Sequence, residues 1–272
     1  ADAADYWQAI ERAVEGNYRR DRQPPFLPLE LYADKPVGDD YDQLFAGMIV
    51  KPGEELFSSR FGVTKETMRK VLEAALSKGG DFAELFFEYT LSNSVVMEDD
   101  IIRESTEDVA LGVGIRVLND RQTGYAYTSD LSPETMRRTA LTAAAIASSP
   151  ARVRMAEIKP TKPSRQVYLL TSPFAEAPLG DRITLVQEAY AAAKAHDPRI
   201  VKVVANLTDS LQCVTIVNSD GLMVSDVRPQ ARLGTSAVAE ENGRRVSGGA
   251  NKGGRIGMTF YRTPGTTPKE IG

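Results

Sequence analysis

The sequence is poor in the two residue types that most often build catalytic metal sites. It has one cysteine, Cys213, and one histidine, His196, in 272 residues. A lone cysteine cannot form an internal disulfide, which excludes a small disulfide-stapled scaffold. A catalytic zinc site usually takes three protein ligands, chiefly histidine and cysteine, and no HExxH motif is present. We therefore expect no catalytic residue, metal ligand or cofactor site in this chain.

Long apolar runs and a basic surface are also absent. No run approaches the roughly 20 residues that span a bilayer, so no membrane partner is expected. The net charge is −4 and the basic residues are spread among acids, which argues against direct nucleic-acid binding. The first residues do not resemble a signal peptide, which favours a cytoplasmic location, although an exported chain whose signal was removed would begin similarly.

The first 60 residues differ in pattern from the remainder. An amphipathic helix is predicted between Tyr6 and Tyr18, and three prolines within residues 24–28 end it. Residues 29–53 are rich in proline, glycine and aspartate and show no sustained period. We interpret residues 1–60 as an irregular N-terminal arm.

Regular structure is expected from Thr64, a favourable N-cap for a helix that ends at Gly79. Short β-branched and aromatic runs separated by turn signals then predict an antiparallel meander. These runs are residues 83–91, 94–98, 101–106, 110–118 and 124–128. Ser132 and Pro133 begin a second helix, with proline at the first helical position. The pattern predicts an α/β subdomain at residues 61–160.

A basic, proline-bearing connector at residues 150–164 leads to a second predicted α/β subdomain, residues 161–272. Its predicted elements are a helix at 181–195 and strands at 167–170, 200–207, 212–218, 222–228 and 231–240. Hairpin turns are expected at Ser219-Asp220-Gly221 and Asn242-Gly243. The predicted class is therefore α+β, with antiparallel sheets, packed helices and two subdomains.

The end of the chain is rich in glycine. Residues 248–257 are interpreted as a flexible linker, and the last residues as the first turn of a capped helix. The alternative for the glycine-rich segment is that nearby basic residues grip an anion or an acidic peptide. Those residues are Arg244, Arg245, Lys252 and Arg255.

The remaining candidate residues have simple structural interpretations. His196 follows a predicted helix and suits its negative end. Cys213 lies in an apolar strand and suits packing. The acidic run at residues 98–100 suits a solvated turn, and Gly112 and Gly114 suit close strand packing. The exposed edges of strands remain as a feature that could bind a partner, because an extended peptide can join a sheet there.

Several ordered segments resemble the TldD/PmbA family, known as modulators of DNA gyrase, and most strongly its TldD branch. They are residues 78–88 (KGGDFAELFFE), 112–117 (GVGIRV), 121–128 (RQTGYAYT), 218–221 (NSDG), 228–229 (RP) and 243–245 (GRR). The resemblance covers about residues 56–272 and leaves the arm unmatched.

The resemblance implies a two-part zinc metallopeptidase that trims unfolded or modified peptides, acts in paired subunits and holds its substrate as an extended strand. The family's His-Glu-xxx-His motif belongs to a C-terminal domain and is absent here, so the glycine-rich linker would lead toward a catalytic domain that this chain lacks. Arg116, Tyr125 and Tyr127 are candidates for peptide or subunit contact, with a purely structural role in their strands as the alternative.

Three functional hypotheses remain. The first is the substrate-guiding and assembly region of a TldD-like zinc metallopeptidase, whose zinc lies outside this chain. The second is a stand-alone peptide-binding or regulatory module without hydrolytic activity. The third is a modulator of a DNA enzyme that acts through protein contact.

Overall fold

A computed structural model describes residues 55–119, 122–148, 155–161 and 177–272. The predicted helix in the first 18 residues and the predicted strand at 167–170 lie outside these residues. The described strands form one seven-stranded sheet in the order β3-β2-β1-β5-β6-β4, with β7 also paired to β6. All neighbours are antiparallel except the short β4, which is parallel to β6. The predicted α+β class is confirmed.

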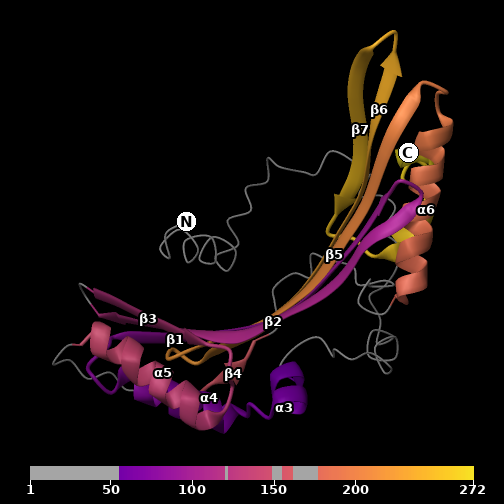
Figure 1. The fold of residues 1–272 in the computed structure, drawn as a ribbon. Helices are drawn as coiled ribbons and strands as arrows, with labels where there is room; N and C mark the ends of the chain where they lie inside the picture. Colours follow the sequence, from indigo (N-terminus) through magenta and orange to yellow (C-terminus); the bar gives the residue numbers. More distant parts are fainter. Residues whose placement is uncertain (1–54, 120–121, 149–154, 162–176) are drawn as a thin grey trace, which may run out of the picture. The chain divides into compact units, whose positions relative to one another are not determined.

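The elements are named here by their bounds (Figure 1). The strands are β1 (Phe82–Glu98), β2 (Ile101–Asn119), β3 (Gln122–Thr128), β4 (Lys159–Pro160), β5 (Ile200–Asn218), β6 (Leu222–Glu241) and β7 (Arg244–Gly254). The helices are α3 (Glu55–Phe61), α4 (Lys65–Leu76), α5 (Pro133–Ile146), α6 (Leu179–Ala195) and α7 (Pro268–Ile271), with a 3₁₀-helix, η3 (Met258–Arg262).

The prediction of many short strands was wrong, because β1, β2, β5 and β6 are each continuous over 17 to 20 residues. The polar residues that suggested interruptions face polar partners on neighbouring strands, as Ser92 does opposite Ser210. Pro229 lies between the segments of β6 that pair with β4 and with β7. Among the described residues, β6 has a strand neighbour on one side only at this point, where proline is tolerated.

β1 and β5 join the two predicted subdomains. They pair along 15 positions, from Glu84 opposite Asn218 to Glu98 opposite Val204, so one sheet runs through residues on both sides of position 160. The boundary between residues 61–160 and 161–272 therefore does not coincide with a break in the sheet. As a division between family domains it stays a prediction.

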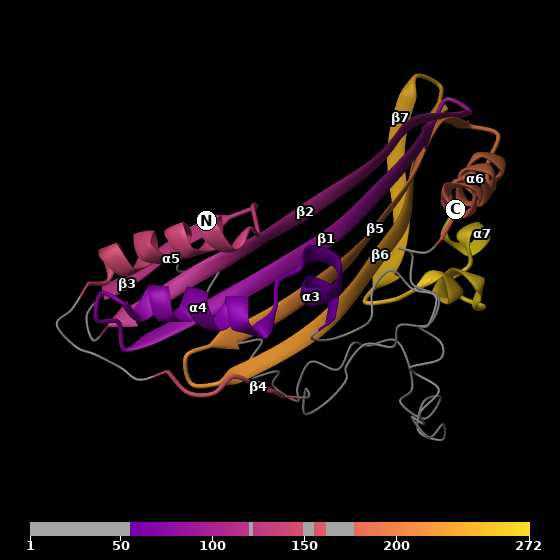
Figure 2. The ribbon, with the colours of Figure 1, turned by 90° about the horizontal axis from the view of Figure 1, so that it is seen from below.

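The helices of the described residues lie on one face of the sheet (Figures 1 and 2). Side chains alternate along a strand, so the odd-numbered residues of β1 share this face. Near the start of β1 the face is covered by α4 and α5, and a Cβ added at Gly124 would meet the Ala143 carbonyl of α5 at 2.0 Å. Near the end of β1, Val95 packs with Leu207 and Leu233 against α6. The opposite face is called the even face below.

The ordered unit begins earlier than predicted, since α3 occupies residues assigned to the irregular arm. Phe57 is 1% exposed, and its ring centroid lies 5.2 Å from that of Phe87 on β1. Leu56 is also buried. Two buried apolar side chains fix this short helix on the sheet, an effect of tertiary packing that local composition does not reveal.

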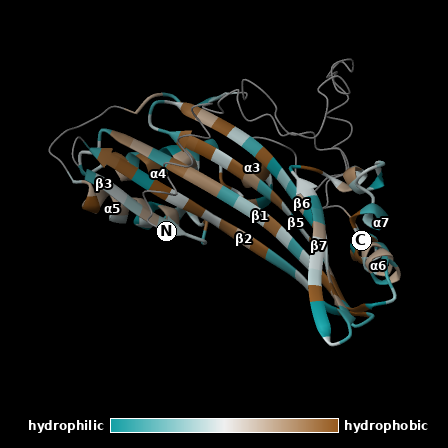
Figure 3. Cartoon of the chain, turned by 90° about the horizontal axis from the view of Figure 1, so that it is seen from above, coloured by the Kyte–Doolittle hydropathy of each residue, from teal (hydrophilic) through white to brown (hydrophobic). Residues whose placement is uncertain are grey.

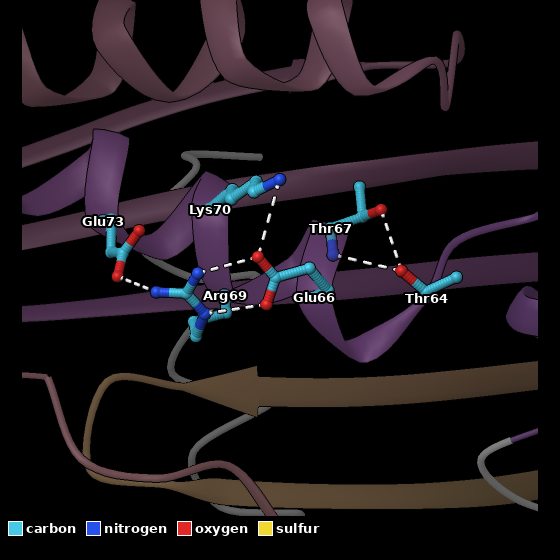
Figure 4. Close-up of polar contacts among 6 residues, drawn as sticks. All are labelled: Thr64, Glu66, Thr67, Arg69, Lys70 and Glu73. Carbon is cyan, nitrogen blue, oxygen red and sulfur yellow. Dashed lines mark hydrogen bonds and ion pairs between the residues drawn. The ribbon is translucent and has the colours of Figure 1, made fainter.

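α4 begins where the sequence predicts (Figure 4). The Thr67 amide donates to Thr64 Oγ1 at 3.2 Å, which satisfies one of the helix's unpaired amides. On the exposed side, Arg69 bridges Glu66 and Glu73. The hydrogen bond from Arg69 lowers the pKa of Glu66 to about 2. Ser132 caps α5 similarly, with Pro133 at the first helical position, as predicted.

The interpretation of the glycine-rich segment as a flexible linker was wrong. Residues 244–254 form β7, which pairs with β6 from Glu241 opposite Arg244 to Ala231 opposite Gly254. The predicted turn at Asn242-Gly243 connects the two strands, and both residues have positive φ, +51° and +75°. This backbone conformation matches the twist of a tight hairpin and directs the following residues into pairing, whatever their apolar content.

Candidate peptide-binding edges

The described residues do not fit a zinc site. No group of three or more histidine, cysteine, aspartate and glutamate side chains among them is placed to hold a metal ion. His196 is exposed at the C-terminal end of α6. Cys213 is 2% exposed, and burial raises the pKa of its thiol to about 12. We derive no catalytic step from either residue.

The acidic turn between β1 and β2 is balanced by basic neighbours. Glu98 pairs with Lys202, Asp99 with Arg103 and Asp100 with Lys194. Asp99 and Asp100 both have positive φ, as a two-residue hairpin turn requires. The predicted solvated turn is therefore present, and its carboxylates are engaged in ion pairs.

Arg116 is buried between strands. It is 8% exposed, and its Nη2 lies 3.3 Å from Oε1 of Glu84, which is also 8% exposed. In the strand register Arg116 lies opposite both Glu84 on β1 and Tyr125 on β3. The structure thus brings Arg116 and Tyr125 together as cross-strand neighbours on the even face.

The two candidate tyrosines differ in exposure. Tyr125 is half-buried, and burial raises its pKa. A Cβ added at Gly114 would lie 2.8 Å from the Tyr125 hydroxyl, which agrees with the predicted close packing at this glycine. Tyr127 lies on the same strand and is 77% exposed. A contact role for the two tyrosines and Arg116 stays a prediction, and Tyr127 is the most accessible of the three.

A hydrogen-bonded polar network crosses the even face and was not identified from the sequence. Thr90 Oγ1 and Gln212 Nε2 both donate to Glu88 Oε1, at 2.9 and 2.8 Å. Arg228 Nε donates to Asp226 Oδ2 at 2.7 Å. Arg228 Nη1 also donates to Gln212 Oε1 at 3.5 Å, so the network links β1, β5 and β6 on the face that no described helix covers. The only signal in the sequence was the alternation of side chains between the two faces of each strand. The predicted strands were too short to show which polar residues share a face.

A second network is buried on the helix face. Arg182 of α6 donates through Nε to Asp209 Oδ2 at 2.9 Å, and Asn93 Nδ2 donates to Asp209 Oδ1 at 3.0 Å. Asp209 is 4% exposed and Arg182 is 5% exposed. Arg182 Nη1 also donates to the Ala177 carbonyl at 2.7 Å. This charged cluster fixes α6 to β5 and β1.

The sheet has several free strand edges within the described residues, among them residues 224–230 of β6 and the outer side of the short β4. β3 pairs only with residues 113–119 of β2, which leaves residues 101–112 of β2 without an outer neighbour. The outer sides of β3 and β7 are also unpaired there. Figure 3 shows hydrophobic and hydrophilic bands alternating along the central strands, whereas β7 is pale to hydrophilic apart from one hydrophobic band. Free edges carry unused backbone donors and acceptors, so they are the places where a peptide could join the sheet.

Comparison with known proteins places the chain in a family. Residues 83–147 match the model of the PmbA/TldA metallopeptidase domain 1, and residues 172–269 match that of the PmbA/TldA metallopeptidase central domain. Together the two models cover more than half of the chain. The chain therefore belongs to the PmbA/TldD metallopeptidase family, as its sequence motifs predict.

Similar proteins include metalloprotease TldD homologs. That of Haemophilus influenzae is 28% identical over 204 residues, covering 73% of this chain and 42% of the relative. That of Buchnera aphidicola (Acyrthosiphon pisum) is 27% identical over 200 residues, covering 74% and 41%. The chain thus spans about two-fifths of the length of these curated relatives.

Solved structures share the fold. A proposed modulator of a DNA gyrase from Thermotoga maritima has a TM-score of 0.58 at 22% identity, covering 76% of this chain and 45% of that one. TldE from Thermococcus kodakarensis has a TM-score of 0.54 at 13% identity, covering 70% and 43%. No helix in the described part of the chain has the length and apolar character needed to cross a membrane.

Proposed function

We propose that this chain is the substrate-guiding and assembly region of a TldD-like zinc metallopeptidase. Zinc and the catalytic residues would lie in a further domain, and the peptide would reach them as an extended strand. The region would pair with a second TldD- or TldE-type subunit, in the cytoplasm. Hydrolysis of unfolded or modified peptides would belong to the assembled protein.

The observation that carries this proposal is the order of the two family domains in the chain. Domain 1 matches residues 83–147 and the central domain matches residues 172–269. The curated relatives are named metalloproteases and are more than twice as long as the matched region. The metal ligands that such an activity needs are not grouped among the described residues. A division of labour between this region and a metal-binding region accounts for both facts.

The free edges give the guiding role a physical mechanism. Backbone pairing at a strand edge recognises an extended chain with little regard to its side chains. Most strands of a folded protein are already paired, whereas an unfolded or modified peptide can offer a strand with both edges unpaired. Selection for unfolded peptides would then precede hydrolysis.

The alternative is a peptide-binding or regulatory module that acts without hydrolysis, including modulation of a DNA enzyme through protein contact. The gyrase-related descriptions of structural neighbours favour it. This alternative requires only free strand edges, and the described sheet has them.

The intact mass and zinc content of the protein from its native source would separate the two. We expect a mass roughly twice the 29.7 kDa of this chain, bound zinc, and chelator-sensitive cleavage of an unfolded peptide. A native mass of 29.7 kDa with no zinc and no cleavage by any co-purifying chain would refute the metallopeptidase role and support the binding module.

A further inference from the structure

β7 is exposed along its whole length. All eleven of its residues are exposed, on both faces, and β6 is its only strand partner among the described residues. Its outer edge is therefore a ladder of backbone groups that face no described strand (Figure 1). At about 3.4 Å per residue, this edge can pair with an extended peptide of about ten residues.

The charge of β7 has one sign. The strand contains Arg244, Arg245 and Lys252 and no acidic residue. The register with β6 places Arg244 and Lys252 on the helix face and Arg245 on the even face. An added strand would therefore meet positive charge on both of its faces. Arg245 forms an ion pair with Glu240 of the same hairpin at 2.7 Å.

Glycine makes the backbone of β7 accessible. Four of the eleven residues are glycines, so much of the edge has no side chain to obstruct an approaching chain. Val246 is 67% exposed and supplies an apolar contact beside the basic residues. Residues 246–251 of this edge carry none of the charged side chains or prolines that commonly protect an exposed edge.

We propose that the outer edge of β7 binds an extended acidic peptide segment by strand addition. Backbone hydrogen bonds would hold the segment, and its carboxylates would face Arg244, Arg245 and Lys252. The inference rests on the proposed guiding role and adds to it the edge that is used and the charge of the peptide.

The opposite edge of the same end of the sheet is net acidic, since its one basic residue, Arg103, pairs with Asp99. The free part of β2 includes Glu104, Glu107 and Asp108, all exposed. Like charges would repel an acidic peptide from β2, so the two edges discriminate between peptides. Binding of the acidic segment is therefore directed to one edge.

Fluorescence anisotropy with the full chain tests the charge. The probe is a labelled peptide of about ten residues in which Glu alternates with Val or Thr, and the matched peptide has Gln in place of Glu. We expect the Glu peptide to bind about tenfold more tightly than the Gln peptide, and to lose this advantage at high salt. The combined variant R244E/R245E/K252E should weaken binding of the Glu peptide at least about tenfold.

The matched control reverses three exposed basic residues elsewhere. The variant K78E/R137E/R138E makes the same change in net charge on α5 and on the turn before β1. We expect its affinity for the Glu peptide to stay within about twofold of the unchanged chain. Equal loss in both variants would show that net charge, and not β7, attracts the peptide, and would overturn the proposal.

A peptide methylated on alternate backbone nitrogens tests strand addition. It keeps every carboxylate but cannot donate hydrogen bonds from one edge, so we expect it to lose most of its affinity. Unchanged affinity would overturn strand addition. Amide hydrogen exchange should slow in β7 when the Glu peptide binds, and slowing confined to β2 or β3 would also overturn the proposal.

The outcomes separate this inference from the proposed function. If an acid-free unfolded peptide binds the chain and R244E/R245E/K252E has no effect, this inference fails and the guiding role stands. If R244E/R245E/K252E instead abolishes self-association in sedimentation equilibrium, without changing peptide affinity, the occupant of β7 is a second copy and the peptide proposal is wrong. Failure of the metallopeptidase role is read separately, from native mass, zinc and cleavage.

Discussion

β5 and β7 belong to the same sheet but owe their structure to different forces. β5 has strand neighbours on both sides, α6 across one face and buried residues along most of its 19 positions. β7 has one strand neighbour and eleven exposed residues. Burial of apolar surface stabilises β5, whereas backbone pairing and the preceding hairpin turn hold β7. A strand of the second kind is free to exchange its outer partner.

The difference predicts how stability is distributed. Local opening costs little where few apolar contacts are lost, so β7 should open well below the free energy of global unfolding. β5 should exchange its amides only on global unfolding. An edge that opens easily and pairs easily is suited to transient peptide binding, whereas the centre of the sheet maintains the frame.

The largest loss of stability is expected from removing the buried carboxylate of Asp209 on the central strand β5. Asp209→Ala leaves Arg182 buried opposite no carboxylate and removes the acceptor of Asn93. Such an uncompensated buried charge costs about 3–5 kcal/mol, measured as the loss in free energy of unfolding in urea. The matched control is Asp226→Ala on β6, whose carboxylate is 41% exposed and pairs with Arg228. It should cost less than about 1 kcal/mol, and equal losses would contradict the assignment.

The second prediction concerns the extent of the core behind β1. Phe57→Ala deletes a ring that is 1% exposed and packs on Phe87. We expect a loss of about 3 kcal/mol in the free energy of unfolding. Arg60→Ala, on the same helix, removes cation-π contacts with Phe61 and Tyr89 and should cost less than about 1 kcal/mol. If the Phe57→Ala protein were as stable as the unchanged chain, α3 would not contribute to the core and would belong with the N-terminal arm.

The third prediction concerns two glycines of β7. A Cβ at Gly253 would lie 2.3 Å from the Ala231 carbonyl oxygen, whereas one at Gly248 would have no atom within 4 Å. Gly253→Ala should therefore strain the pairing of β7 with β6 by about 2 kcal/mol, and Gly248→Ala should be neutral or slightly stabilising. Amide exchange across β7 measures the difference. If both variants accelerate exchange equally, the close approach at Gly253 does not determine the pairing.

Helices and turns were predictable from the sequence because their signals are local. Thr64, Ser132 and Pro133 have the roles at helix N-termini that their chemistry suggests, and Asn242-Gly243 forms the expected turn. The family could also be recognised, since its motifs are short and keep their order along the chain.

Strand continuity and charge pairing could not be predicted, because they depend on partners distant in sequence. Asp209 suggests a break in a strand until Arg182 and Asn93 are known to face it. The composition of β7 suggests a linker because it has few residues that could be buried. The strand nevertheless forms, since all of its residues are exposed and backbone pairing holds it. The free edges follow from strand order, which no local pattern encodes. Of the candidate contact residues, the sequence could not show that Arg116 is buried and Tyr127 exposed.

The smallest effect is a pH dependence that distinguishes the centre from the edge. Burial raises the pKa of Cys213 on β5 from 9.0 to about 12, so the folded state retains a proton that the unfolded state releases as pH rises above about 9. Stability is then complete below that pH and is lost progressively above it. The linkage amounts to about 1 kcal/mol at pH 10. Cys213→Ala lacks this group, so its stability should fall less between pH 8 and pH 10 than that of the unchanged chain.

Urea unfolding of both proteins at the two pH values isolates the effect of the thiol, because lysines, tyrosines and any cavity left by the substitution influence both measurements of each protein. Parallel curves would mean that the thiol is accessible in the folded state. Thiol labelling at pH 8 gives an independent reading, with Cys213 reacting only after unfolding. Rapid labelling of the native chain would show that β5 opens locally. That result would contradict the proposed difference between a packed central strand, β5, and an exchangeable edge strand, β7.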